Sequence, residues 1–405
     1  MIDDIATLDD YDFAGKTVLL RLDLNTPIDP KTGEFLEDRR MRSHVPTIQE
    51  LVDKRARIVC MAHQGQAGES EFTSLEKHGK HLGKLAGVKV QYADDLFGPT
   101  ARTMVKNLRD GEVLLLDNVR MYSEEALERP PEVHATSYLV KNLAPLGDYF
   151  VNDAFGTAHR SHASTVGFTT ILPSAAGRLM EKEIRALSDV LRNPRKPLIF
   201  ILGGAKIKDS MKIMQKALDG GVDKILVGGV LANVFLAAKD YRLGEPTIEF
   251  IRGKKFVDQI DVAKQILDKY SDRIVLPLDV AINKNGERVE MTLSQLPQDY
   301  QIVDVGKLTV QKYTAEIKAA GTVFFNGALG LYETPAFAYA TEEVIKAISQ
   351  AKCFSVIGGG DTVAAARNMN VEDKITHVST GGKASIDYLA GVKMAAIEAL
   401  RMAKK

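Results

Sequence analysis

Several features of other protein classes are scarce or missing from this 405-residue sequence. Lysine plus arginine and aspartate plus glutamate both number 53, so the chain lacks the basic excess typical of nucleic-acid-binding proteins. Residues 1–5 are acidic and do not resemble a secretory signal, and no apolar run approaches the roughly 20 residues of a membrane span. We therefore expect neither a nucleic-acid nor a membrane partner, and we expect a cytoplasmic protein.

Cysteine is also rare. The only two are Cys60 and Cys353, and both lie in apolar stretches. Cysteines in such stretches are typically buried thiols, and few of them in a chain of this length suit a reducing compartment. We expect two buried, reduced thiols rather than a disulfide.

Two familiar nucleotide-binding motifs are missing as well. The sequence contains no G-x-x-x-x-G-K-[ST], which excludes a P-loop protein. Gly358 and Gly360 resemble the start of a dinucleotide fingerprint, but Val363 occupies the position of its third glycine. The sequence therefore argues against a dinucleotide-dependent dehydrogenase.

What the chain does contain is a regular alternation of short apolar runs with amphipathic segments. The amphipathic segments predict helices, for example over residues 45–54, 99–108, 254–270 and 310–320. This alternation is typical of an α/β fold, in which parallel sheets are covered by helices on both faces. The apolar runs that predict buried strands are residues 17–22, 57–62, 113–116, 149–151, 198–202, 224–227, 273–276, 323–325, 353–357 and 375–378.

The length suits two domains, and a junction is visible near the middle of the chain. A helical stretch over residues 177–191 runs into the polar, turn-rich segment 192–197. We therefore expect one domain over 1–176, a connecting helix and linker over 177–197 and a second domain over 198–385. The last stretch, residues 384–405, has a helical pattern and could dock on either domain.

The predicted strands of the first half are followed by charged and amide side chains. Because parallel strands bring their carboxyl ends to one rim, these side chains should gather there. Asp23 and Asn25 can bind a hydroxyl group, and the cationic groups suit a small, multiply charged anion. A lone arginine or histidine is more often structural, but the convergence of several is hard to explain as solvated surface. The cationic set comprises His63, Arg120, His159, Arg160 and His162, and Arg39, Arg40 and Arg42 lie near the start of the next predicted helix.

The strands of the second half are followed by glycines instead. Glycine between a strand and a helix lets backbone N–H groups approach phosphates closely. A carboxylate beside phosphates is repulsive unless a cation lies between them, so Asp361 suggests Mg²⁺ bound to a nucleotide. Thr362 could cap the following helix or contact a phosphate. The glycine-rich segments are residues 203–204, 228–229, 327–330, 358–360 and 381–382.

With these residues in place, the sequence resembles phosphoglycerate kinase over nearly its whole length. The resemblance implies two Rossmann-like domains joined by a hinge helix that close on one another, with residues 386–405 packing back on the first domain. It also implies reversible in-line phosphoryl transfer between 1,3-bisphosphoglycerate with MgADP and 3-phosphoglycerate with MgATP, in glycolysis and gluconeogenesis. The matching segments are residues 21–27 (RLDLNTP), 151–162 (VNDAFGTAHRSH), 202–206 (LGGAK), 357–362 (IGGGDT) and 377–382 (HVSTGG).

The resemblance also implies roles for individual residues. Arg40, Lys206 and Gly360 match the catalytic positions, and Asp361 matches the position beside the metal. Glu333 resembles the residue that hydrogen-bonds the ribose. The phosphoglycerate site would be formed by Asp23, Asn25, Arg40, His63, Arg120 and Arg160. The nucleotide site would be formed by Gly203, Gly204, Lys206, Gly228, Gly229, Asn326, Gly330, Glu333, Gly358, Gly359, Gly360, Asp361 and Thr362.

The chain departs from the family pattern at four positions. Gln66 replaces an arginine, which removes one cation near the substrate phosphate, and Ser210 replaces a second lysine that either Lys208 or Lys212 could supply. Ala328 replaces a proline and Lys383 a glycine. The Ser210 variant resembles the archaeal branch. These changes keep a second hypothesis open, a binding or regulatory protein without turnover. Whether the chain is a monomer or a homodimer stays open too.

Overall fold

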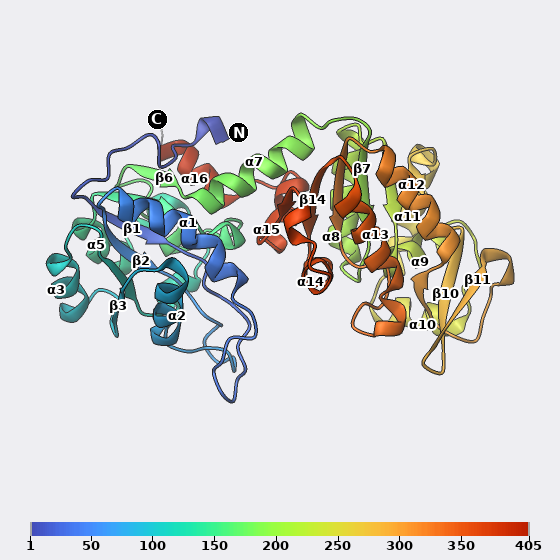
Figure 1. The fold of residues 1–405 in the computed structure, drawn as a ribbon, viewed down its shortest axis with the longest axis horizontal. Helices are drawn as coiled ribbons and strands as arrows, with labels where there is room; N and C mark the ends of the chain where they lie inside the picture. The colour runs from blue at the N-terminus through green and yellow to red at the C-terminus, as the bar shows by residue number, and fades with distance from the viewer. Residues whose placement is uncertain (1, 404–405) are drawn as a thin grey trace. The chain divides into compact units, whose positions relative to one another are not determined.

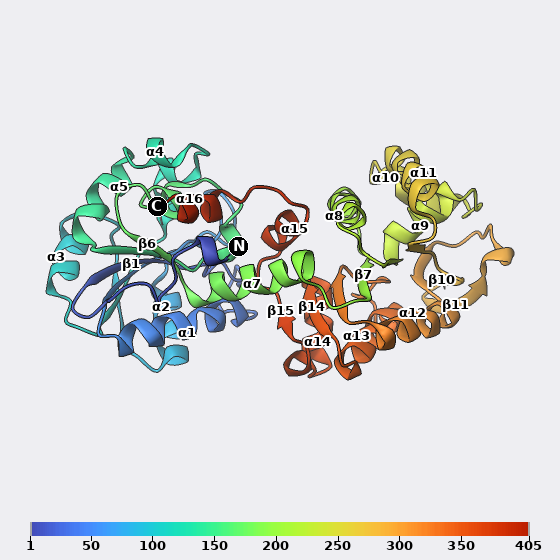
Figure 2. The same cartoon turned by 90° about the horizontal axis from the view of Figure 1, so that it is seen from above.

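The computed structural model describes residues 2–403 (Figures 1 and 2), and these residues form two compact units. Unit 1 comprises the residues up to Arg185 together with those from Lys393 onward. Unit 2 comprises Ala186–Val392. The helix α7, Arg178–Arg192, contains the boundary between the two units.

Unit 1 is built on a six-stranded sheet in the order β3-β4-β2-β1-β5-β6, in which every pairing is parallel. The sequence predicted four of these strands. It missed β3, a partly exposed edge strand, and β6, whose three small residues carry no apolar signal. The strands are β1 Thr17–Arg21, β2 Arg57–Met61, β3 Val90–Ala93, β4 Val113–Leu116, β5 Tyr149–Asn152 and β6 Ser174–Ala176.

Helices cover both faces of this sheet (Figure 2). One face packs against α1 (Arg39–Asp53) and α2 (Glu76–Ala86). The other face packs against α3 (Pro99–Asn107), α5 (Tyr138–Leu143) and α6 (Ala163–Val166). Helix α1 begins six residues earlier than the sequence predicted, because Met41 and His44 continue its buried face ahead of Pro46. A short helix, α4 Pro131–His134, lies beside α6.

Unit 2 repeats this plan with a six-stranded parallel sheet in the order β15-β14-β13-β7-β8-β9. Three further strands, β10 Asp279–Lys284, β11 Glu287–Thr292 and β12 Ile302–Val305, form an antiparallel sheet that the sequence did not predict. The two mainly parallel, helix-covered sheets confirm the expected fold class. The parallel strands are β7 Leu198–Leu202, β8 Lys224–Val227, β9 Ile274–Val275, β13 Thr322–Asn326, β14 Phe354–Gly358 and β15 His377–Val378.

One face of this second parallel sheet carries a buried core formed with three helices, α12 Lys307–Ala319, α13 Tyr339–Gln350 and α14 Gly360–Asn368. The predicted helix 254–270 begins only at Asp258, because Lys255 adopts φ +58° and cannot be helical. The remaining helices of unit 2 are α8 Ile207–Asp219, α9 Gly229–Ala238, α10 Glu245–Gly253, α11 Asp258–Tyr270 and α15 Lys383–Leu389.

The C-terminal segment is not the single helix that the pattern over residues 384–405 suggested. It forms α15 and then α16, Ala395–Ala403, separated by Gly391 with φ +74°. Helix α15 contacts α8 in unit 2. Helix α16 packs in unit 1, where the Ala396 N–H donates to the Ala158 carbonyl at 3.0 Å. The left-handed conformation at Gly391 thus ends one helix before the next begins.

Two expectations from composition can be compared with the structure. Cys60 is buried, whereas Cys353 is only partly buried, and neither forms a disulfide. The expectation of two buried thiols is therefore right for Cys60 and too strong for Cys353. Within residues 2–403 we find no helix with both the length and the apolar character that crossing a membrane requires.

The start of α7 is fixed by a buried carboxylate, Asp153, which follows β5. Its Oδ1 accepts hydrogen bonds from the N–H groups of Leu179 and Met180 at 2.9 and 3.3 Å. Its Oδ2 lies 2.8 Å from Nδ1 of His44, whose Nε2 accepts from the Asp23 N–H at 3.0 Å. Because its Nε2 must be unprotonated to accept, the neutral form of His44 donates from Nδ1 to Asp153. Asp153 therefore joins α7 to α1 and to the segment after β1.

Replacing Asp153 with alanine should lower the free energy of unfolding by about 3 kcal/mol, because buried donors lose their acceptor. Asp189→Ala, an exposed carboxylate on α7, should change it by less than about 0.5 kcal/mol. Chemical denaturation of both variants measures the difference. Equal stability of the two variants would contradict this role of Asp153.

Candidate active site

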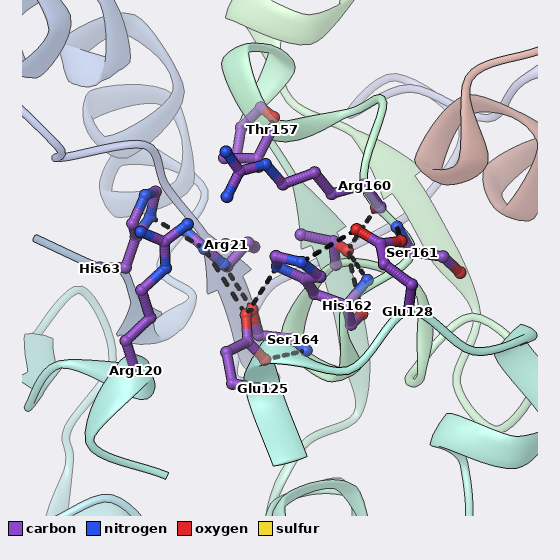
Figure 3. Close-up of polar contacts among 12 residues, drawn as sticks. Arg21, His63, Arg120, Glu125, Glu128, Thr157, Arg160, Ser161, His162 and Ser164 are labelled. Carbon is purple, nitrogen blue, oxygen red and sulfur yellow. Dashed lines mark hydrogen bonds and ion pairs between the residues drawn. The ribbon is translucent and has the colours of Figure 1, made fainter. Parts of the chain in front are cut away.

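Several of the cationic residues expected at one rim of unit 1 come together there. The central strand β1 pairs with β2 on one side and β5 on the other, and β4 lies beyond β2. These four strands are parallel, so the residues that follow them emerge at the same edge. Figure 3 shows that the side chains of His63, Arg120 and Arg160 point toward a common region above Arg21.

The first strand end places Asp23 and Asn25 beside Arg40, which lies at the start of α1. Arg40 Nη1 is 3.4 Å from Asp23 Oδ2 and donates to the Asn25 carbonyl at 2.6 Å. The Asn25 side-chain oxygen accepts from the Gly65 N–H at 2.8 Å, which ties this segment to the loop after β2. Asp23 is buried, whereas a third of the Arg40 side chain is exposed. Arg40 can therefore contact a ligand while it keeps its carboxylate partner.

Charge around Asp23 is strong enough to reverse the effect of burial. Burial alone would raise its pKa, but the attraction of nearby positive charge, that of Arg40 above all, lowers the pKa to about 2, from an ordinary 3.8. Because the folded-state pKa is depressed, Asp23 stabilises the fold by about 2 kcal/mol above about pH 5, and that contribution is lost as the pH falls toward 2.

The Asp23→Asn variant should lack this dependence. The stability advantage of the wild type over the variant should be smaller at pH 3 than at pH 6, by about 1 kcal/mol. Urea unfolding of both proteins at the two pH values measures it. A difference that does not change with pH would contradict the depressed pKa of Asp23.

The guanidinium groups of the rim repel one another. Burial, followed by repulsion from Arg160 and Arg21, lowers the pKa of Arg120 to about 10, so it remains protonated at neutral pH. Arg120 Nη1 donates to the Gly65 carbonyl at 2.6 Å, and Arg160 Nε lies 3.4 Å from His159 Nε2. An anion bound at this place would relieve the repulsion between the cations.

Not every residue of the expected cationic set faces the rim. His162 turns toward two glutamates, with Nε2 3.1 Å from Glu128 Oε1 and Nδ1 3.9 Å from Glu125 Oε1. Burial and then the nearby arginines lower its pKa to about 3, so it adds no positive charge at neutral pH. Sequence reasoning also missed Glu125, because a glutamate in the charged stretch 124–128 reads as solvated surface.

In unit 2 the glycine-rich loops pack tightly against one another. A Cβ at Gly203 would meet the Ala328 carbonyl oxygen at 2.3 Å, and one at Gly327 would meet the Gly203 carbonyl oxygen at 2.4 Å. The N–H groups of Gly203, Gly204, Gly228 and Gly229 all donate to main-chain carbonyls of the protein at 2.7–3.0 Å. In this structure these four glycines therefore permit close packing of the loops rather than leave N–H groups free for phosphate.

The loop after β14 is open at Gly360. A Cβ at Gly360 would meet nothing within 4 Å, and this residue begins α14, where N–H groups are not used by the helix. Thr362 is buried and its Oγ1 accepts from the Gly327 N–H at 3.0 Å, so its hydroxyl braces the neighbouring loop. The Asn326 side-chain oxygen lies 3.1 Å from the position a Cβ of Gly359 would take. The open space in this loop is therefore at Gly360, at the N-terminus of α14.

Asp361, Lys206 and Glu333 are exposed side chains that act on one another electrostatically. Partial burial and then repulsion from Glu333 raise the pKa of Asp361, whereas attraction to Lys206 lowers it. Lys206 precedes α8 and forms no ion pair with the acidic side chains among residues 2–403, whereas Lys208 lies 3.9 Å from Asp258. A divalent cation near Asp361 would reverse the shift in its pKa.

The positions where the sequence departs from the resemblance lie in different environments. Gln66 is exposed and its amide donates to Glu69 at 3.2 Å, whereas Ser210 is buried within α8. Lys208 and Lys212 are both exposed, so burial does not distinguish them. Lys383 donates to Asp387 at 2.9 Å along α15. Of the four departures, Ser210 and Ala328 are buried, whereas Gln66 and Lys383 are exposed.

Together, the two helix-covered parallel sheets, one with a cationic rim and one with glycine-rich loops, define a two-unit α/β enzyme for phosphorylated ligands. Residues 8–392 match the family model described as phosphoglycerate kinase. The chain belongs to the phosphoglycerate kinase family. It is a phosphotransferase that moves a phosphoryl group reversibly between 1,3-bisphosphoglycerate and ADP, giving 3-phosphoglycerate and ATP.

Archaeal relatives match the chain along almost its entire length. The phosphoglycerate kinase of Methanothermobacter thermautotrophicus is 46% identical over 395 residues, which cover 97% of this chain and 96% of that protein. The phosphoglycerate kinase of Methanopyrus kandleri is 45% identical over 402 residues, which cover 99% of this chain and 98% of that protein. These matches agree with the archaeal resemblance that Ser210 suggested.

Solved structures agree with the sequence relatives. The crystal structure of phosphoglycerate kinase from Pyrococcus horikoshii OT3 has a TM-score of 0.91 and 40% identity, covering 99% of each chain. The phosphoglycerate kinase of Coxiella burnetii has a TM-score of 0.84 and 31% identity, covering 99% of this chain and 100% of that one. The fold and the family thus rest on both sequence and structure.

Proposed function

We propose that the rim of unit 1 binds the phosphoglycerate and that the loops of unit 2 bind the magnesium nucleotide. The observation that carries the first assignment is that Arg40, at the start of α1, and His63, Arg120 and Arg160, which follow parallel strands, lie at one rim with Asp23 and Asn25. The cations match the carboxylate and phosphate of the substrate, and Asp23 and Asn25 match its hydroxyl.

Within this assignment, fixed cations carry the chemistry. Charge spreads over the oxygens of the phosphoryl group in flight, and Arg40 and Lys206 would stabilise it without a covalent intermediate. Gly360, at the open start of α14, would donate its N–H to the same oxygens. Asn326 and Glu333 would orient the nucleotide, with Glu333 at the ribose.

The residues present fit a magnesium ion that arrives with the nucleotide. Mg²⁺ commonly binds one or two carboxylates together with phosphate oxygens and waters, and Asp361 offers one exposed carboxylate beside the open loop. Among residues 2–403 no three His, Cys, Asp or Glu side chains gather as a metal site of their own. When bound, the ion would neutralise phosphate charge, and Asp361 would hold it.

Asp361→Asn should therefore weaken the use of MgATP specifically. We expect the Mg²⁺ concentration for half-maximal turnover to rise by about tenfold or more, with the KM for 3-phosphoglycerate changed less than twofold. Glu372→Gln, in the same unit at the short helix Glu372–Lys374, serves as a comparison. Equal magnesium dependence in the wild type and Asp361→Asn would contradict the role of Asp361.

For transfer the two ligands must meet, so we propose that residues 177–197 act as a hinge about which the domains close. Closure would exclude water and prevent wasteful ATP hydrolysis. Small-angle scattering should show a more compact particle when both substrates are added than with either alone. An unchanged profile would count against closure. A cytoplasmic location and a monomeric or homodimeric state remain predictions.

A further inference from the structure

Arg21, at the end of β1, is enclosed directly beneath the cationic rim. Its side chain is 1% exposed. Its Nε donates to Ser164 Oγ at 2.7 Å and its Nη1 donates to the Leu22 carbonyl. Its Nη2 lies 3.2 Å from Nδ1 of His63 and 3.9 Å from Oε1 of Glu125 (Figure 3). Every nitrogen of this guanidinium thus faces a group of the protein, so Arg21 has little capacity left to bind a substrate itself.

The contact with Arg21 determines where His63 carries its proton. A guanidinium has five donors and no acceptor, so the hydrogen bond requires a lone pair on His63 Nδ1. In the neutral imidazole the proton must then lie on Nε2. A second proton on Nδ1 would place two donors against each other and add a charge beside Arg21. His63 is 2% exposed, and burial followed by repulsion from Arg21 lowers its pKa well below the ordinary value.

The position of Arg21 is in turn fixed by a directed pair of hydrogen bonds. Because Arg21 Nε only donates, the Ser164 hydroxyl accepts from it and must send its own proton to Glu125 Oε1, at 2.5 Å. Glu125 Oε2 accepts from the Ser164 N–H at 2.8 Å. Glu125 is 1% exposed, and burial raises its pKa, against the attraction of Arg21. Glu125 and Ser164 therefore hold one fully enclosed cation in one orientation.

We propose that Glu125, Ser164 and Arg21 are positioning residues that keep His63 neutral, with its Nε2–H as a hydrogen-bond donor to the bound phosphoglycerate. This inference rests on the assignment of the phosphoglycerate to the rim of unit 1. His63 then contributes a directed hydrogen bond rather than a positive charge. The positive charge of the site comes from the arginines. The charged groups that act on His63 are Arg21, Asp23, Arg120 and Arg160.

The proton state of His63 can be measured without turnover. Nitrogen-15 NMR of the full chain with labelled histidine should show the Nε2–H tautomer for His63 at pH 7, assigned by comparison with His63→Gln. The spectrum should show a neutral His63 ring down to pH 5.5. A protonated Nδ1 at pH 7, in either the other tautomer or the doubly protonated ring, would overturn the proposal.

Kinetics test the positioning residues. Glu125→Gln keeps the size of the side chain but removes the charge that faces Arg21, so the KM for 3-phosphoglycerate should rise about tenfold or more, while the KM for ATP changes less than twofold. Glu128→Gln is the matched control, because Glu128 contacts His162 and the Ser161 N–H rather than Arg21. Equal KM values for Glu125→Gln and Glu128→Gln would overturn the proposal.

A second variant keeps the test decisive if Glu125→Gln does not fold. Ser164→Ala leaves the charge of Glu125 in place and removes the acceptor of Arg21 Nε. It should raise the KM for 3-phosphoglycerate about threefold and partly shift the His63 signals away from the Nε2–H pattern. Unchanged KM and unchanged His63 signals in a folded Ser164→Ala protein would overturn the proposal. If the wild type showed no turnover with 3-phosphoglycerate, the assigned function would fail, and the His63 tautomer would still be measurable.

Discussion

The Arg40→Ala variant should lose at least about a hundredfold in kcat, with a much smaller change in the KM for ATP. Arg40 already has Asp23 and the Asn25 carbonyl as partners, and these contacts leave its guanidinium partly exposed. A cation held in place in this way costs little reorganisation when charge develops on the transferring phosphoryl oxygens. Removal of one group that stabilises transition-state charge typically costs about 10²–10³ in kcat.

The control is Arg42→Ala. Arg42 lies on the same helix, is exposed, and pairs with Asp38 through its Nε at 2.7 Å. Its loss should change kcat less than twofold, because it contacts no residue of the rim. Circular dichroism of both variants checks folding, since Arg40→Ala also leaves Asp23 without its nearest cation. If a folded Arg40→Ala protein kept more than half of the wild-type kcat, Arg40 would not act on the phosphoryl group.

The second large effect should come from Lys206→Ala, which we expect to lower kcat by about a hundredfold or more. Lys206 is exposed at the start of α8, and its ammonium group influences Asp361, so it lies within electrostatic range of the loop we assign to the phosphates. Binding of MgATP, measured by calorimetry, should weaken far less than turnover falls. That separation would show that the lysine acts mainly on the transition state.

Lys208→Ala and Lys212→Ala are the comparisons for Lys206→Ala, and they also address the serine at position 210. Ser210 is buried, whereas both lysines are exposed on the same helix. If one of them supplies the second cation, its alanine variant should lose about tenfold in kcat while the other stays near wild type. If Lys206→Ala behaved like both neighbours, Lys206 would have no special role.

Much of the fold could be predicted because apolar runs and amphipathic segments follow simple periods. The buried strands β1, β2, β4, β5 and β7 are short runs dominated by apolar residues. Few elements other than buried strands have this pattern. The antiparallel strands β10 to β12 were missed because each contains charged residues and β11 is partly exposed, so neither period dominates. The split of the C-terminal helix depended on one left-handed glycine, Gly391, and glycine alone does not reveal its φ angle.

For the candidate site, the sequence predicted the positions of some residues and missed those of others. Residues directly after parallel strands, such as Asp23 and His63, were placed well because topology brings strand ends together. The tight packing of Gly203 and Gly228 depended on the approach of loops distant in sequence, which no local pattern records. Glu125 was missed because it lies in a charged stretch that resembles solvated surface. Its burial follows from α6 folding over the segment that contains it, which places Ser164 within 2.5 Å of its carboxylate.

The most direct test of the assigned activity is ATP turnover by the purified protein, with and without 3-phosphoglycerate, coupling the acyl phosphate product to NADH oxidation. We predict rapid turnover that requires both 3-phosphoglycerate and Mg²⁺ and that is lost in Arg40→Ala and Lys206→Ala. Binding of MgATP without any turnover would contradict the account. It would mean that the anion site serves another ligand, and the exposed Gln66 would then be the first residue to replace with arginine.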